Sequence, residues 1–414
     1  MSSFDLAALF LTAVGFGAWA NARTARLPHG VAMLFVGIGG ALVILLLKAL
    51  RLDMAANLIS AISHVDFART VMGYMLGFLL FAGAMQVDLA ELRRRTLSVW
   101  TLATIGVVAS TVVVGFGLWL AARALGEGLT LPWALVFGAL VSPTDPIAVL
   151  ATVKRGHLSK TLQVILQGEA LFNDGVGIVV FTALLAFATG ASASPLRAVG
   201  EVFVGAVGGL ALGALGGLVV LRALRSVDDF VVEVSLSLAL AMAVYSGAQA
   251  LHLSGAIAAV AAGLLVGDGR TRRSGAPAAE VYLKSFWTLV DEILNALLFL
   301  LLGLELVIVP LDPAAAGLCL AAILLVLLSR FAVVLPWGSY LRLRHEERGA
   351  NLILAWGGLH GALSLALALS VPSGPQRPLI LAAAYAVAAF SVAVQGLTFE
   401  PLTRRLHARH VGGR

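Results

Sequence analysis

The segment Leu162 to Ala188 reads LQVILQGEALFNDGVGIVVFTALLAFA, an apolar run long enough to cross a membrane. It carries three polar residues near its centre: Glu169, Asn173 and Asp174. Ionisable groups inside an apolar membrane segment are costly, and they usually carry the function. This segment therefore indicates a helix that contributes to an ion path.

The composition of the chain is that of a polytopic membrane protein. Of 414 residues, 60% are hydrophobic and 12% are charged, with a mean hydropathy of +0.98; soluble domains are about 45–50% apolar. The net charge of +6 comes from small Lys and Arg clusters between apolar runs, which favours topology signals over nucleic-acid binding. Cys319 is the only cysteine and lies in an apolar run, so it supports neither a disulfide framework nor a metal site, and we expect no cofactor besides the transported ions.

Thirteen apolar runs of roughly 20 residues divide the sequence. With that number, one set of alternate loops holds 21 Lys and Arg residues and the opposite set holds 6. The positive-inside rule then places the N-terminus outside and the C-terminus in the cytoplasm of a multi-pass cell (inner) membrane protein. No segment remains for a soluble regulatory domain, so we expect the function to reside in the membrane bundle.

Two of the thirteen runs contain helix breaks. Span five, Leu131 to Val153, contains the motif SPTDP (142–146), and span twelve, Leu352 to Val371, contains WGGLHG (356–361). The breaks are 215 residues apart, and the same offset relates span four to eleven and six to thirteen. Because seven spans is an odd number, the two repeats are inverted, with discontinuous helices that cross, as in alternating-access transporters.

Helical geometry separates the polar residues of span six. At about 100° per residue, Glu169 and Asn173 share one face, while Asp174 is turned by about 140° from Glu169. Arg330 is the only Lys or Arg deep in a span, and a buried guanidinium needs a carboxylate partner, so we expect a structural ion pair with Glu169. With Glu169 paired, Asp174 has no fixed counter-charge and faces Thr144 and Asp145 on the broken span five.

The chemistry of this second group favours a small cation. Thr144, Asp145 and Asp174 offer hard oxygen atoms, which suit Na⁺. A carboxylate without a fixed counter-charge in apolar surroundings can trade a proton for a cation at cellular pH. We therefore expect cation and proton to compete for Asp174. The alternative for Asp145 is a helix cap at the break.

Five stretches resemble the sodium/proton exchanger (monovalent cation:proton antiporter) superfamily, in particular its bacterial NhaP-like branch. The stretches are SPTDP (142–146), GEALFNDG (168–175), LHLSG (251–255), FLLLGLE (299–305) and residues 356–369, and the likeness covers nearly the whole chain. The resemblance implies exchange of Na⁺, Li⁺ or K⁺ for H⁺ by an antiporter rather than an enzyme, with Thr144, Asp145 and Asp174 as ligands. Asn173 stands where the electrogenic branch carries a second aspartate, which implies electroneutral exchange.

The resemblance also implies a division of the single membrane domain and a homodimer. Spans four to six and eleven to thirteen (97–190 and 314–400) form a moving transport core. The remaining spans (1–96 and 197–309) form a scaffold that carries the dimer interface.

Three positions depart from the family pattern. Ala170 stands for a usual Ser, Ala82 lies where the third span usually carries Glu, and His360 stands for a usual Arg. Histidine titrates near neutral pH, so His360 either makes the break pH-sensitive or, as a neutral imidazole, hydrogen-bonds exposed backbone groups. An unchanged pH dependence in His360→Arg would favour the second interpretation.

Other functions remain as alternatives. A sodium-coupled carrier of an organic anion also uses helix breaks, and a cation channel also places acids in a membrane. An intramembrane hydrolase is not favoured, because the sequence has no HExxH motif. Two smaller features stay open: glycines 205, 209, 213 and 217 predict a close contact with a neighbouring span or a second subunit, and Asp291 and Glu292 could line a funnel.

Overall fold

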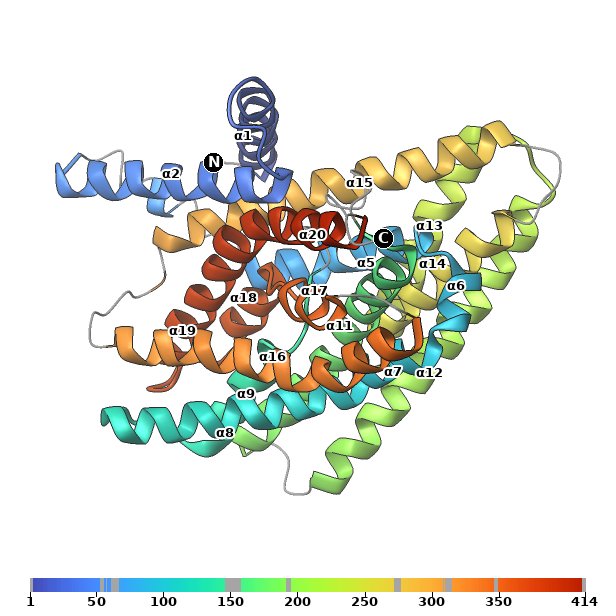
Figure 1. Ribbon diagram of the computed structural model, residues 1–414. Coiled ribbons are helices and arrows are strands. Elements are labelled where there is room, and N and C mark those ends of the chain that lie inside the picture. Colours follow the sequence, from blue (N-terminus) through green and yellow to red (C-terminus); the bar gives the residue numbers. More distant parts are fainter. Residues whose placement is uncertain are drawn as a thin grey trace.

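The computed structural model is a helical bundle that describes residues 3–52, 56, 58–60, 67–145, 158–190, 195–271, 277–307, 309, 315–345 and 349–411 (Figure 1). In the first half of the chain the helical segments are α1 (Ser3–Arg23), α2 (His29–Ala49), α4 (Phe67–Thr70), η1 (Val71–Met75), α5 (Leu76–Met85), α6 (Leu89–Arg94), α7 (Thr96–Thr101), η2 (Leu102–Gly106), α8 (Val107–Leu125), α9 (Leu131–Leu140) and α11 (Lys160–Ala188). The second half contains α12 (Pro195–Leu224), α13 (Phe230–Ala250), α14 (Gly255–Thr271), α15 (Pro277–Leu304), η3 (Glu305–Val307), α16 (Ala316–His345), α17 (Ala350–Trp356), α18 (Ala362–Leu369), α19 (Arg377–Phe390), η5 (Ser391–Gln395) and α20 (Gly396–Val411).

The all-helical membrane class predicted from the sequence is confirmed. Within the described ranges, nine helices are long and apolar enough to cross a membrane, and α9 and α14 are shorter apolar helices. The exact count of thirteen spans and their repeat relation stay predictions. Span twelve is broken where the glycines indicated, since α17 ends at Trp356 and α18 begins at Ala362. The second half of span five, with Pro146, lies outside the described residues.

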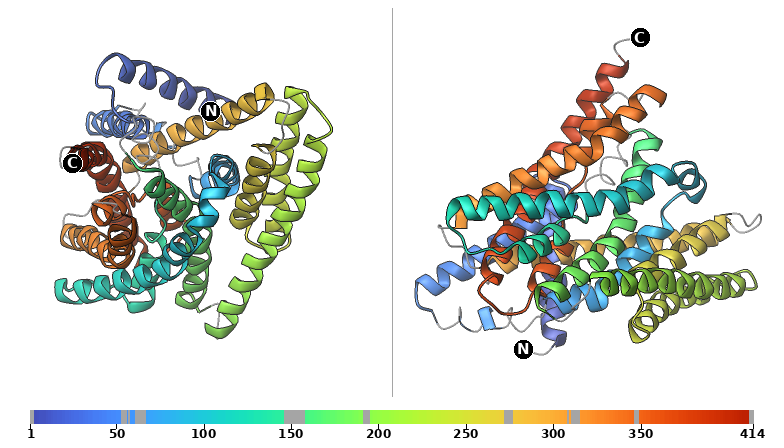
Figure 2. Two further views of the ribbon diagram at one scale, coloured as in Figure 1. Left: turned by 45° about the vertical axis from the view of Figure 1, so that its right-hand side comes forward. Right: turned by 90° about the horizontal axis from the view of Figure 1, so that it is seen from below.

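The helices form two groups with α11 between them (Figure 2). On one side α12 packs along α14, α14 packs along α5, and α2 packs along α15. On the other side α8 packs on α9 and α16, and α16 also packs on α17 and α19. Segments far apart in sequence, such as α8 and α16, therefore lie side by side (Figure 1).

The hydrophobic interior follows the same two groups. One cluster of buried side chains joins α5, α13, α14 and α15 around Trp287, which is fully buried. A second joins α8, α9, α16, α18 and α19 around Phe137, and a third joins α11, α16 and α17 around Ile165 and Phe399. A fourth cluster, around Met33 and Leu34, connects α2 and α15 with residues of α18 and α19. The clusters around Trp287 and Phe137 thus lie mostly within one group each, whereas the cluster around Met33 and Leu34 joins helices of both groups.

The glycine stripe of α12 is explained by a neighbouring helix of the same chain. Gly209, Gly213 and Gly217 lie directly against the backbone of α14, at Ser254, Ala258 and Ala262. A Cβ atom at Gly213 would collide with the Ala258 carbonyl, so the close approach requires glycine there. Of the two interpretations left open by the sequence, this contact corresponds to the neighbouring span.

Candidate functional site

The two helix breaks cross each other at the centre of the molecule. Helix α9 ends at Leu140, and the extended residues after it meet the loop between α17 and α18. The backbone N–H of Asp145 donates to the carbonyl oxygen of Leu359 at 2.6 Å, which forms an isolated antiparallel bridge. The crossing therefore satisfies backbone groups that a broken helix exposes in apolar surroundings.

Polar side chains from neighbouring helices hold the first break in place. Ser142 donates to the carbonyl of Gly138 at 2.7 Å, and its hydroxyl lies 3.0 Å from that of Thr111 on α8. Both residues are buried. These contacts fix the point where α9 stops and the chain turns toward Thr144 and Asp145.

The second break brings a helix N-terminus against Asp145. Gly361 lies in contact with the Asp145 carboxylate, and a Cβ atom in its place would overlap that group. Gly361 precedes α18, whose first backbone N–H groups form the positive end of a helix. The positive end of α18 therefore stabilises the charged form of Asp145.

Glu169 on α11 and Arg330 on α16 form a buried ion pair. Arg330 Nη2 donates to Glu169 Oε2 at 2.9 Å, and Nη1 donates to Oε1, so the contact is bidentate. Nη2 also donates to the carbonyl of Leu354 on α17 at 3.1 Å. The guanidinium lies against Gly358, where a larger residue would displace it. One arginine thus connects α16, α11 and the first half of the broken span twelve.

Asn173 and Asp174, also on α11, face the break that follows α9. Asn173 Nδ2 donates to Thr144 Oγ1 at 2.8 Å, and both side chains are buried. The hydrogen bond leaves the Thr144 oxygen with lone-pair capacity for a further partner. Asp174 is partly exposed to a cavity and is close enough to Asp145 for their charges to interact.

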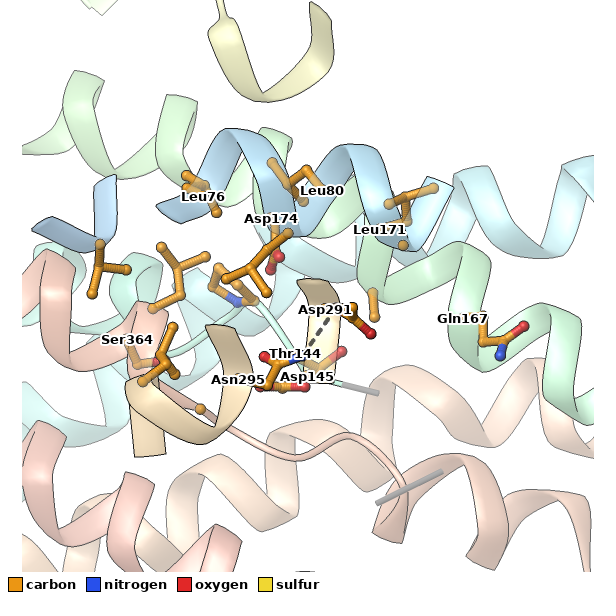
Figure 3. Close-up of a pocket in the computed structure, with 18 of the residues that line it drawn as sticks. Leu76, Leu80, Thr144, Asp145, Gln167, Leu171, Asp174, Asp291, Asn295 and Ser364 are labelled. Atoms are coloured by element: carbon orange, nitrogen blue, oxygen red, sulfur yellow. Dashed lines mark hydrogen bonds between the residues drawn. The ribbon is translucent and has the colours of Figure 1, made fainter. Parts of the chain in front are cut away.

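A cavity of about 110 Å³ joins these residues (Figure 3). Its polar lining residues come from five segments: Gln86, Thr144, Asp145, Gln167, Asp174, Asp291, Asn295 and Ser364. Among the residues that the structure describes, the lining includes three carboxylates but no Lys, Arg or His. It extends to Gln86 and Val87, where α5 ends, which is the side predicted to be cytoplasmic. Such an oxygen-rich, anionic cavity suits a cation or a proton.

Ser364 is a site residue that the sequence reasoning missed. Its side chain lines the cavity, is 1% exposed, and has no hydrogen-bond partner among the described residues. A helical serine usually bonds a carbonyl one turn earlier, but Ser364 lies in the first turn of α18. Residues 357–361 are not helical, so the hydroxyl is available to the cavity. The Gly-rich break was the signal that could have found it.

His360 connects the two breaks. Its ring Nδ1 lies 3.1 Å from the carbonyl oxygen of Pro143, and its backbone N–H donates to Ser391 Oγ at 2.8 Å. Because a carbonyl can only accept, Nδ1 carries the proton in this contact. This geometry corresponds to the interpretation of His360 as a group that bonds exposed backbone. The other two departures from the family pattern are alanines, which have no polar side-chain atoms. Ala82 is fully buried and Ala170 lines the cavity, and neither adds a polar group.

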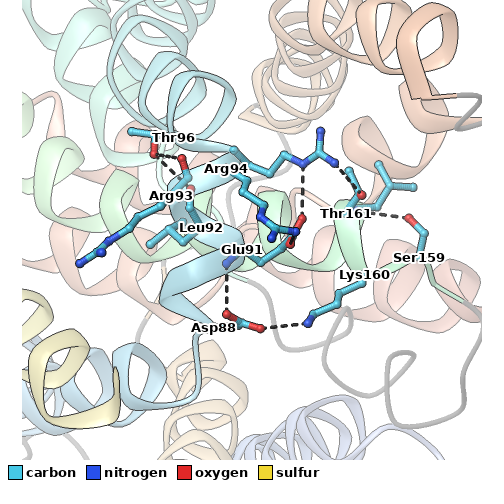
Figure 4. A network of polar contacts seen from close by, with 11 residues as sticks. Asp88, Glu91, Leu92, Arg93, Arg94, Thr96, Ser159, Lys160 and Thr161 are labelled. Atoms are coloured by element: carbon cyan, nitrogen blue, oxygen red, sulfur yellow. Dashed lines mark hydrogen bonds and ion pairs between the residues drawn. The ribbon is translucent and has the colours of Figure 1, made fainter. Parts of the chain in front are cut away.

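A polar network ties α6 and α7 to the start of α11 (Figure 4). Asp88 accepts from the N–H of Glu91, which caps α6, and pairs with Lys160 Nζ at 2.9 Å. Arg95 pairs with Glu91 at 3.6 Å and donates to Thr161 Oγ1 at 3.3 Å. The hydrogen bond from Lys160 holds the pKa of Asp88 below its usual value. Asp88 therefore stays charged at neutral pH, and its ion pair joins the start of α6 to the start of α11.

The chain is similar to known proteins over nearly its whole length. A family model described as "Sodium/hydrogen exchanger, transmembrane" matches residues 9–405. The chain is 38% identical over 414 residues to the Na(+)/H(+) antiporter NhaP of Pseudomonas aeruginosa, covering 98% of this chain and 97% of that protein. It is 33% identical to the Na(+)/H(+) antiporter NhaH of Halobacillus dabanensis, with 96% of each chain covered.

The fold is also found among solved structures. The sodium proton antiporter MjNhaP1 from Methanocaldococcus jannaschii superimposes with a TM-score of 0.73 at 20% identity, covering 100% of this chain and 99% of that one. A second structure of that protein, at pH 8, gives a TM-score of 0.64 over 91% of this chain and 99% of that one, at 21% identity. These matches show that the helical arrangement is the one found in that antiporter.

Proposed function

The chain belongs to the sodium/hydrogen exchanger family and exchanges Na⁺ for H⁺, and from that premise we propose that Asp174 is the group for which the two ions compete. The observation that carries this proposal is the position of Asp174. It lines an anionic cavity beside the crossed breaks, whereas the other acid of α11 is engaged by Arg330.

The proposed cycle uses the neighbours of Asp174 in different ways. Asp145 keeps its charge because the N-terminus of α18 lies against it. Asp174 has no such support and must be neutralised by a proton or a cation before it can move through apolar surroundings. Thr144, oriented by Asn173, supplies a neutral oxygen to the bound Na⁺. A site that carries neither a proton nor a cation is charged and does not cross the membrane. The movement of Na⁺ in one direction is therefore coupled to the movement of H⁺ in the other.

One mobile carboxylate implies a simple stoichiometry. If Asp174 carries either one proton or one cation, each cycle exchanges one for one and is electroneutral. Asn173 supports this proposal, because an amide beside Asp174 adds no second proton-binding group. Li⁺ fits the same hard oxygen atoms, whereas K⁺ would require a wider arrangement.

Motion of one helix group against the other would provide alternating access. We propose that 97–190 and 314–400 move as a transport core and that 1–96 and 197–309 form the scaffold of a homodimer. Support comes from the buried clusters around Trp287 and Phe137, each of which lies mostly within one of the two groups. The same proposal places the protein in the cell (inner) membrane, with the N-terminus outside and the C-terminus in the cytoplasm, as the Lys and Arg distribution indicates.

The test is transport by purified protein in proteoliposomes that contain a fluorescent pH indicator. External Na⁺ should drive proton efflux from the vesicles, and Li⁺ should do so as well. Asp174→Ala should abolish the signal, whereas electroneutral exchange should persist when the membrane potential is clamped to zero with K⁺ and valinomycin. Full activity of Asp174→Ala would contradict the proposed site.

A further inference from the structure

Helix α15 carries two polar side chains into the cavity from the side opposite α11. Asp291 and Asn295 are one helical turn apart, both line the cavity, and both are partly exposed (Figure 3). Asn295 Nδ2 donates to Asp291 Oδ1 at 3.0 Å. The amide therefore orients the carboxylate while adding no positive charge to the cavity wall.

The charge of the lining makes Asp291 relevant to the transported ion. Asp145, Asp174 and Asp291 share one small cavity, and none of the described residues that line it is a Lys, Arg or His. Three carboxylates in apolar surroundings repel one another, so a cation in the cavity lowers the energy of all of them. The unpartnered, buried hydroxyl of Ser364 in the same wall independently indicates that the cavity holds a ligand.

The three acids do not form one closed cage. Among the described residues, no group of three or more Asp, Glu, His or Cys side chains is close enough to hold a metal ion jointly. The three carboxylates of the cavity therefore do not surround one ion jointly, which leaves room for separate ion positions at the α15 wall and on α11.

We propose that Asp291 is a second cation-binding residue, which receives Na⁺ at the scaffold wall and passes it to Asp174. This inference rests on the proposed function and extends it. Since α15 lies in the proposed scaffold and α11 in the core, Asp291 can contact the ion only while the cavity opens toward Gln86 and Gln167. Asp291 then raises the local cation concentration and is left behind when the core moves.

Replacement of Asp291 should therefore change cation affinity more than turnover. In proteoliposomes, Asp291→Asn should raise the apparent KM for Na⁺ about tenfold, because one nearby charge is lost. The maximal rate should stay within about twofold of the unmodified protein. Asp291→Glu should restore the KM. The matched control is Glu292→Gln. Glu292 is the next residue of α15, is exposed, and is not among the residues that line the cavity.

Several results would overturn this inference. A KM in Asp291→Asn within about twofold of the unmodified protein would do so, as would complete loss of exchange at saturating Na⁺ in a variant with a normal size-exclusion profile. If Asp291→Asn does not fold, Asn295→Ala removes the orienting amide instead, and an unchanged KM there contradicts the proposal. Absence of Na⁺-driven proton movement in the unmodified protein would refute the proposed function itself and is measured first.

Discussion

Glu169 and Asp174 lie five residues apart on α11, yet their surroundings differ completely. Glu169 is 1% exposed and held by both Nη atoms of Arg330, whereas Asp174 borders a cavity in which no described lining residue is basic. The difference arises because five residues rotate a side chain by about 140° around a helix. Two acids in one membrane span can therefore serve different purposes, one structural and one for transport.

The sharpest contrast between the two acids is expected in transport. Asp174→Asn should reduce Na⁺-driven proton movement to the level of empty liposomes, because an amide cannot exchange a proton for a cation. Folding should be retained, since the cavity tolerates a neutral side chain of the same size. Fluorescence-detected size-exclusion chromatography verifies folding. Retained exchange in Asp174→Asn would contradict the assignment of Asp174 to transport and of Glu169 to structure.

The ion pair should instead control stability. Glu169→Gln leaves a buried guanidinium without its counter-charge, which should cost about 3 to 5 kcal/mol of unfolding free energy. Arg330→Met should cost a similar amount and also release Leu354 on α17. The double variant Glu169→Gln with Arg330→Met should recover part of the loss, as a double-mutant cycle in thermal unfolding measures. Additive losses would mean that the two residues do not act as a pair.

A smaller effect is expected at the second break. Ser364→Ala removes one neutral oxygen from the cavity, so the KM for Na⁺ should rise about threefold to tenfold, with little change in maximal rate. The control is Ser370→Ala at the end of the same helix, where the hydroxyl already donates to the Leu367 carbonyl at 2.7 Å. Equal KM values in the two variants would exclude Ser364 as a ligand.

The smallest effect is expected at the exposed network beside α11. Lys160→Gln should change the exchange rate by less than about twofold, because exposed ion pairs contribute little. The lowered pKa of Asp88 means that its stabilising charge is present above its unfolded value of 3.8 and is lost only as pH falls through the still lower folded value. The pH profile of Lys160→Gln should therefore match that of the unmodified protein above about pH 5. A shifted profile there would show that the network takes part in pH regulation.

Much of this arrangement could be predicted from the sequence because a membrane makes charge expensive. Lone Arg330 predicted the contact with Glu169, and the prolines and glycines predicted the positions of the breaks. The helical rotation between Glu169 and Asp174 by itself predicts that the two side chains have different surroundings. These features depend on one residue or one helix at a time.

The remaining features depend on contacts between distant segments. Asp291 and Glu292 are adjacent acids, and only the placement of α15 decides which of them lines the cavity. Ser364 resembles an ordinary small helix residue until the preceding residues are known to be non-helical. The partner of the α12 glycines could not be chosen either, because small residues fit a neighbouring span and a second subunit equally well.

The central claim is that Na⁺ and H⁺ compete for Asp174, and the dependence of the apparent KM on pH tests it most directly. Initial rates of exchange are measured in proteoliposomes over a range of Na⁺ concentrations at several pH values. In the acidic range, where the proton occupies the site, the KM for Na⁺ should rise about tenfold for each unit fall in pH, while the maximal rate stays constant. A constant KM with a maximal rate that falls with pH would contradict competition at one carboxylate.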